Sequence, residues 1–215
     1  MKRFENLNST MVTRNHSKNK VSMKILVMFS LILICISVYA EECEGYYVTN
    51  NFDTIKCKID ISKNIFWKDV YHFHWISEGV RLTDAEGVKF FRPQEITSFV
   101  VTVPNGVICK FISVQTDNRY FYREMAVGKI SMYLKYQTHP YDRGMLTDCV
   151  FFKNGQSTIL GFMNTKRNQR KKVSLLLSDN PEVLAKWEKA KFTIDTLQEI
   201  IEEYNKAETE TRLEK

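Results

Sequence analysis

The chain has 215 residues, of which 44% are hydrophobic and 26% are charged, and its formal net charge is +6. Residues 1–40 contain six of the 31 Lys and Arg residues and one of the 25 Asp and Glu residues, so residues 41–215 carry a net charge near +1. A nearly neutral chain lacks the basic surface of nucleic-acid-binding proteins, and we expect no nucleic-acid partner.

Residues 23–40 have the pattern of an export signal. A basic residue opens the segment, an apolar run follows from 25 to 38, and a small-x-small cleavage site ends at Ala40. The apolar run is shorter than the roughly 20 residues of a membrane-spanning helix. We therefore expect cleavage after Ala40 and a periplasmic or secreted protein. Residues 1–22 are polar and predict a disordered leader, or a leader that is not part of the protein.

A β-rich region follows, in which short runs of Val, Ile, Thr, Tyr and Phe alternate with turn signals such as Asn154-Gly155. Regular spacing of this kind predicts an antiparallel sheet, rolled into a barrel or arranged like a sandwich. The expected strands are 45–49, 54–59, 70–76, 80–83, 88–92, 98–103, 107–116, 119–124, 129–137, 149–153 and 157–162.

The pattern becomes helical after Thr165, and three short helices are expected to cover the sheet as an integral lid. The first spans 167–177, the second begins at Pro181 behind a capping segment, and the third follows Thr193. The expected fold class is α+β. We divide the chain into a leader (1–22), a signal peptide (23–40), a single α+β domain (41–206) and a frayed tail (207–215).

Four segments resemble a group of uncharacterised secreted or envelope proteins of Bacteroidota. Residues 45–48 and 53–59, GYYV and DTIKCKI, are similar to the opening GYIV…GDTIxGxI hairpin of that group. Residues 92–99, residues 127–133 and the ending 200–205, which closes on Tyr-Asn, fit the same group. The resemblance implies an envelope compartment and a β-rich fold, and it brings no known reaction.

The chain departs from this group where Phe52 and Cys57 replace glycines. A glycine at position 52 would adopt a positive φ that Phe disfavours, so the type of turn is open. Cys57 makes a disulfide with Cys43 attractive, because a hairpin turning near 50–53 would bring the two flanking segments side by side.

Cysteines allow two interpretations. Cys43, Cys57, Cys109 and Cys149 form an even set, which in an oxidising compartment suggests disulfides with three possible pairings. In the other interpretation all four are small buried hydrophobic residues. No CxxC spacing is present, so the sequence supports neither a thioredoxin-like site nor a zinc ribbon.

The expected strand 70–76 contains the most specific candidate residues. His72 and His74 would share one face and could supply the first two ligands of a metal, although we expect no bound metal or cofactor. Tyr71, Phe73 and Trp75 would share the other face. Tyr71 and Trp75 could contact a glycan or a partner, and the more ordinary interpretation is an aromatic core face opposite solvated histidines.

A basic cluster at the start of the first expected helix could contact an anionic envelope polymer or lipid phosphates, or could be the solvated face of that helix. Its members are Lys166, Arg167, Arg170, Lys171 and Lys172.

The sequence has no GxSxG, SxxK or HExxH motif, so catalysis is the weaker hypothesis. We expect an exported, non-catalytic envelope protein that binds a protein or glycan partner and can contact the membrane peripherally. The alternative is a periplasmic hydrolase or metal-dependent enzyme using His72, His74 or His139.

Overall fold

The computed structural model describes residues 40–63, 71–141, 144–161 and 165–213, with side chains as far as Ala207. All described residues belong to one compact unit, residues 40–215. The expected leader and nearly all of the expected signal peptide lie outside the described residues.

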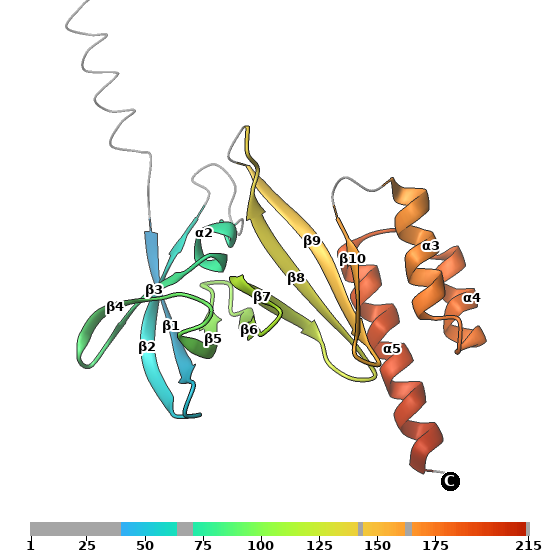
Figure 1. The fold of residues 1–215 in the computed structure, drawn as a ribbon, viewed down its shortest axis with the longest axis horizontal. Coiled ribbons are helices and arrows are strands. Elements are labelled where there is room, and N and C mark those ends of the chain that lie inside the picture. Colours follow the sequence, from blue (N-terminus) through green and yellow to red (C-terminus); the bar gives the residue numbers. More distant parts are fainter. Residues whose placement is uncertain (1–39, 64–70, 142–143, 162–164, 214–215) are drawn as a thin grey trace, which may run out of the picture. The chain divides into compact units, whose positions relative to one another are not determined.

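Ten antiparallel strands of this unit form one sheet, and three helices follow them in the chain (Figure 1), which confirms the α+β class. The order across the sheet is β10-β9-β8-β7-β6-β5-β1-β2-β3-β4. The strands are β1 (Ala40–Thr49), β2 (Thr54–Ser62), β3 (Val80–Asp84), β4 (Gly87–Phe91), β5 (Ile96–Thr102), β6 (Ile108–Val114), β7 (Asp117–Ala126), β8 (Ile130–Thr138), β9 (Met145–Lys153) and β10 (Gln156–Leu160).

The sheet is open, so the expected barrel is wrong. Strand β4 pairs with β3 and β10 pairs with β9, and within the described residues these two strands remain separate edges. Helices contact β7, β8 and β10 and cover the apolar face of the sheet at these strands. Because the helices bury this face, the sheet does not have to close into a barrel to bury it. Strand β8 shows the underlying pattern, since Ile130, Met132, Leu134 and Tyr136 are buried at every second position.

The turn between β1 and β2 places Phe52 in the left-handed region, with φ of 68°. The Phe52 amide donates to the Thr49 carbonyl oxygen over 3.0 Å, which closes the turn. The Phe52 side chain is 79% exposed and therefore gains little from packing. This turn adopts a glycine-like backbone although the residue is phenylalanine.

The expected strand 70–76 is wrong. Tyr71 forms an isolated bridge with Lys63, and a short helix α2 (His74–Ser77) follows it. The Ser77 hydroxyl bonds to the carbonyl oxygens of His74 and Tyr136, at 2.9 and 2.8 Å, and so fixes the helical turn against β8. Successive residues of a helix are rotated by about 100°, so side chains here do not alternate between two faces.

The three C-terminal helices begin where their caps predict. They are α3 (Lys166–Leu176), α4 (Pro181–Lys189) and α5 (Ile194–Leu213). The side chains of Thr165 and Asn180 accept hydrogen bonds from the first turns of α3 and α4, and the Thr193 hydroxyl accepts one from the Thr196 amide. Helix α5 has 20 residues and includes residues 207–213 of the segment predicted as a frayed tail, so this helix is not short.

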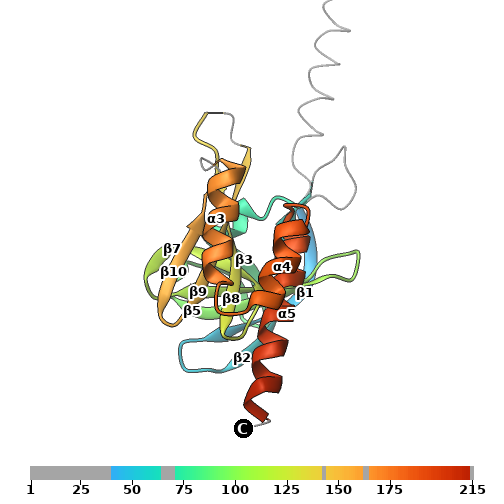
Figure 2. The same cartoon turned by 90° about the vertical axis from the view of Figure 1, so that its right-hand side faces the viewer.

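The helices lie on one side of the β8–β10 end of the sheet (Figure 2) and share one hydrophobic core with it. Asn205 of α5 pairs with the backbone of Ile130 in β8, accepting from its amide at 2.9 Å and donating to its carbonyl oxygen at 2.8 Å. A Cβ on Gly128 would lie 2.4 Å from Asn205 Cγ, so a glycine is needed beneath this amide. The segments 127–133 and 200–205 of the resemblance therefore meet here and have a structural role.

A polar cluster beside this contact ties the helices to one another. The Asp179 carboxylate accepts from Lys153 at 2.7 Å and from Tyr204 at 2.8 Å, and it pairs with Lys129 at 3.3 Å. Burial favours the protonated form of Asp179, but hydrogen bonds from Lys153, Tyr204 and Lys129 outweigh it and lower the pKa to about 2. In the part of the chain that the structure describes, no helix has the length and hydropathy to cross a membrane.

Candidate functional site

An open polar groove of about 410 Å³ lies where three chain segments meet. The segments are the end of α2, the connection between β4 and β5, and the start of β7. The residues that line it combine two arginines, a carboxylate, two amides, a tyrosine ring and a proline. They are Glu78, Arg92, Pro93, Gln94, Asn118, Arg119 and Tyr120.

Local structure sets these positions. Val80 pairs with Phe91, which carries Glu78 and Arg92 to the same end of the β3–β4 ladder. The turn after β4 is closed by the Glu95 amide, which donates to the Arg92 carbonyl oxygen at 3.0 Å. On the third side, a register shift between β6 and β7 frees residues 118–120 from regular pairing. The groove therefore forms only when distant parts of the sheet come together.

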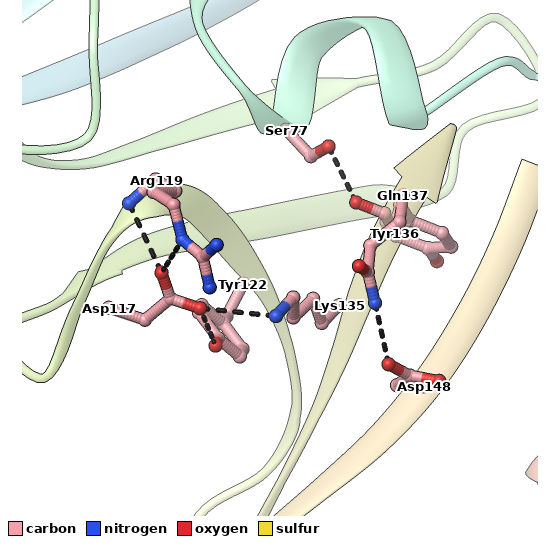
Figure 3. Close-up of polar contacts among 8 residues, drawn as sticks. All are labelled: Ser77, Asp117, Arg119, Tyr122, Lys135, Tyr136, Gln137 and Asp148. Atoms are coloured by element: carbon pink, nitrogen blue, oxygen red, sulfur yellow. Dashed lines mark hydrogen bonds and ion pairs between the residues drawn. The ribbon is translucent and has the colours of Figure 1, made fainter. Parts of the chain in front are cut away.

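Asp117 holds Arg119 at the groove (Figure 3). The Asp117 Oδ1 atom accepts from the Arg119 amide at 3.3 Å and from Arg119 Nε at 3.2 Å. A guanidinium has five N–H donors, so the four on its Nη atoms are not used by this contact. The Arg119 side chain is 77% exposed, which leaves these donors accessible from the groove.

The second oxygen of Asp117 is held from behind the groove. Asp117 Oδ2 accepts from the Tyr122 hydroxyl at 2.9 Å and from Lys135 Nζ at 3.1 Å (Figure 3). Burial favours the protonated form of Asp117, but hydrogen bonds from Tyr122, Lys135 and Arg119 outweigh it and hold its pKa below the usual value. Asp117 is therefore a fixed anion at neutral pH.

The same cluster fixes the tyrosine of the groove. Lys135 Nζ lies 4.6 Å from the centre of the Tyr120 ring, and the Lys135 side chain is only 12% exposed. In the sheet, Lys135 of β8 is paired with Tyr122 of β7 on one side and with Asp148 of β9 on the other. The Asp148 Oδ2 atom accepts a hydrogen bond from Gln137 at 2.6 Å (Figure 3). Lys135 thus supports Tyr120 directly and Arg119 through Asp117.

A partly exposed aromatic pair lies at α2, in the segment that leads to Glu78 of the groove. Trp75 is 51% exposed and stacks on His72, with ring centroids 5.4 Å apart. Trp75 precedes Glu78 by three residues, a spacing that makes side chains neighbours on a helix surface. Of the two aromatic residues predicted to contact a ligand, Trp75 is accessible and Tyr71 is buried, so the prediction for Tyr71 is wrong.

The face assignment of the expected strand holds for Phe73 and is wrong for His74. Phe73 is buried against Phe111 and Tyr136, in agreement with the core expectation. His74 was expected to be solvated but is buried, and neither ring nitrogen has a hydrogen-bond partner among the described residues. The cause is the helical turn, which directs His74 inward and Trp75 outward.

The three histidines do not form one site. The His72 and His74 rings are 5.5 Å apart between centroids, whereas His139 follows β8 and contacts Tyr141. Within the described ranges, no group of three or more His, Cys, Asp or Glu residues could hold a metal ion. His72 and His74 therefore remain two ligands without a third.

All four cysteines are buried and free, so the predicted disulfides do not form. Cys43 lies opposite Ile59 and Cys57 lies opposite Gly45, which places the two cysteines on a diagonal of the β1–β2 ladder. Diagonal neighbours are about 7–8 Å apart, beyond the roughly 4.4–6.8 Å between Cα atoms of a disulfide. Burial raises the thiol pKa of Cys43 and Cys57 to about 11, so both stay protonated near neutral pH.

Two members of the basic cluster make hydrogen bonds to the backbone of this protein. Arg170 donates to the carbonyl oxygens of Trp187 and Ala190 and stacks over the Trp187 ring at 4.8 Å. Lys172 Nζ donates to the Ile159 carbonyl oxygen at 2.9 Å. The remaining three, Lys166, Arg167 and Lys171, are exposed on α3.

The groove itself was missed at the sequence level. Arg92 ended the expected strand 88–92 and, with Gln94, belonged to a segment of the resemblance, whereas Arg119 and Tyr120 opened the expected strand 119–124. No family model matches this chain, and no match was found among curated proteins or solved structures. The site is thus defined by its own geometry.

Proposed function

We propose that this is an exported, non-catalytic envelope protein whose groove binds a glycan. The observation that supports this most is the composition of the groove, where Arg119, Gln94 and Asn118 offer donors and Glu78 offers an acceptor beside the Tyr120 ring. Sugars present hydroxyls at their edges and apolar C–H faces, so a mixture of polar groups and flat rings complements them.

Trp75 extends the same chemistry beyond the groove. Its ring is half exposed and is held flat by the stacked His72, so it costs little conformational freedom when a ligand packs on it. Together with Tyr120 in the groove, it offers a second aromatic contact for a ligand. A ligand of several sugar units suits this arrangement better than a single unit does.

The cellular location in this proposal comes from residues 23–40. Export would bring the protein to the envelope, where polysaccharides are abundant. The exposed residues Lys166, Arg167 and Lys171 on α3 would allow peripheral contact with an anionic membrane surface.

A second candidate function is metal-dependent hydrolysis, which the pair of His72 and His74 favours. A ring-centroid separation of 5.5 Å is compatible with two imidazoles that share one metal. This candidate predicts that Zn²⁺ raises the melting temperature of the wild-type protein, and that His72→Gln abolishes the shift. Identical melts with and without Zn²⁺ would remove the metal function and leave the glycan proposal in place.

The glycan proposal is tested with residues 41–215 and immobilised oligosaccharides prepared from bacterial envelopes. Tyr120→Ala and Trp75→Ala should each weaken retention. Tyr141→Ala is the matched control, because Tyr141 is an exposed tyrosine that does not line the groove. Equal retention of all three variants, each folded by circular dichroism, would refute the assignment of the groove.

A further inference from the structure

The two arginines of the groove are not used in the same way as the other arginines near it. Arg123 donates to the Tyr136 hydroxyl and lies over Phe73 inside the protein, and Arg81 pairs with Asp60. Among the described residues, the Arg92 side chain has no ion-pair partner. The Arg119 guanidinium bonds to Asp117 through Nε and lies 5.6 Å from the centre of the Tyr120 ring, so no hydrogen bond within the described part of the chain uses its Nη atoms. Both guanidinium groups therefore keep free N–H donors at the edge of one groove.

From this we infer that the groove selects an acidic glycan, whose oxyanion is bound by Arg92 and Arg119. The inference rests on the proposed glycan function and names the class of glycan. Guanidinium groups bind planar and tetrahedral oxyanions through paired N–H donors, and such charge-assisted hydrogen bonds are stronger than neutral ones. Among the described residues that line the groove, Glu78 is the one carboxylate beside two arginines.

Asp117 acts in this site as a positioning residue. It takes the Nε donor of Arg119 and is itself fixed by Tyr122 and Lys135, so Arg119 is oriented before a ligand arrives. Preorganised donors lose less freedom on binding and give higher affinity. The contacts of Tyr122 and Lys135 with Asp117 would therefore affect the affinity of the groove for its ligand.

The first test compares glycans of equal length by calorimetry on residues 41–215. The probes are an oligogalacturonate, a sulfated galactan oligosaccharide and a neutral galactan oligosaccharide. We expect an acidic probe to bind about ten-fold or more tightly than the neutral one, with an affinity that falls as salt is added. The better of the two acidic probes identifies the oxyanion as a carboxylate or a sulfate.

Variants connect the preference to the groove. Arg119→Gln and Arg92→Gln should each remove about ten-fold of the affinity for the acidic probe and a clearly smaller part of the affinity for the neutral probe, which loses only neutral hydrogen bonds. Arg167→Gln is the control, since it removes the same charge from α3, whose residues do not line the groove. Equal losses with Arg167→Gln would mean that net charge alone attracts the probe, and the inference would fail.

Asp117→Asn separates positioning from charge. If Asp117 affected the ligand only through its negative charge, its removal should strengthen binding of an acidic probe. If Asp117 orients Arg119, the variant should bind more weakly. Asp117→Asn also removes an ion-pair partner of Lys135, so a second variant is needed. Arg119→Lys keeps the positive charge and leaves Asp117 unchanged, but it lacks the paired N–H donors of a guanidinium. Wild-type affinity in Arg119→Lys would overturn the inference.

Other outcomes distinguish this inference from the proposed function. Equal binding of acidic and neutral probes, unaffected by the arginine variants, refutes the acidic class and keeps the glycan function. Binding of a polyglutamate peptide without binding of any glycan refutes both. Competition by inorganic phosphate as effective as that by the acidic oligosaccharide shows a site for small anions and also overturns the inference.

Discussion

Removal of the Asn205 side chain should detach helix α5 from the sheet. Asn205 makes two hydrogen bonds to the backbone of Ile130, at 2.9 and 2.8 Å, and the side chain of Ile130 is fully buried. In Asn205→Ala the Ile130 amide and carbonyl group both lose their partner. Each unsatisfied buried polar group costs about 1–3 kcal/mol, and the partial exposure of Asn205 admits some water, so we expect a loss of about 2–4 kcal/mol.

The assay is urea unfolding of residues 41–215, supported by thermal melts. For a domain of this size, a loss of about 2–4 kcal/mol lowers the melting temperature by roughly 5–15 °C. Lys206→Ala is the control at the next position, where an exposed side chain should matter by less than about 0.5 kcal/mol.

Asn205→Asp tests the mechanism at constant size. Its carboxylate would still accept from the Ile130 amide, but it would place a second acceptor against the Ile130 carbonyl oxygen. This variant should therefore also be destabilised. A melt like that of the wild type for Asn205→Asp, or equal melts for Asn205→Ala and Lys206→Ala, would show that the amide pair does not hold the helix in place.

Four further outcomes are expected. Phe52→Gly should stabilise the protein by about 0.5–1 kcal/mol in urea unfolding, because relief of the left-handed φ exceeds the entropy cost of glycine; a lower midpoint would contradict this. Burial, with a smaller effect of His72, lowers the pKa of His74 from 6.5, so the folded state favours neutral imidazole and stability should fall as the pH drops below about 6.5. His74→Gln should flatten that dependence in melts between pH 7 and 5, and an unchanged slope would assign it to other groups. Without reductant, a thiol reagent should titrate four groups in the unfolded mature chain and almost none in the folded one; fewer groups would indicate a disulfide. Amino-terminal sequencing of exported protein should begin at Glu41, and recovery of the uncut chain in membranes would refute cleavage.

Local patterns were sufficient for most elements of the fold. Alternating burial in β8 and the caps Thr165, Asn180 and Thr193 depend on neighbours in the sequence, and the corresponding strand and helices were predicted within a few residues. The prediction of a strand at 70–76 was wrong. The residues of this segment alternate with a period of two, which is compatible with a strand, but the hydrogen bond from Ser77 to β8 favours a helical turn. That hydrogen bond joins residues far apart in the chain, so no pattern in the local sequence indicates it.

The sequence by itself determined the α+β class, the succession of strands and helices, and the apolar positions that meet in the core, because these follow from periodicity and capping. Tertiary structure decided the open sheet, the free state of Cys43 and Cys57, and the inward position of His74, because each depends on strand register or on packing between distant segments. The groove is the clearest case. Arg92 and Arg119 belong to different connections of the sheet, and only the folding of β3, β4 and β7 around α2 places their charges at one opening.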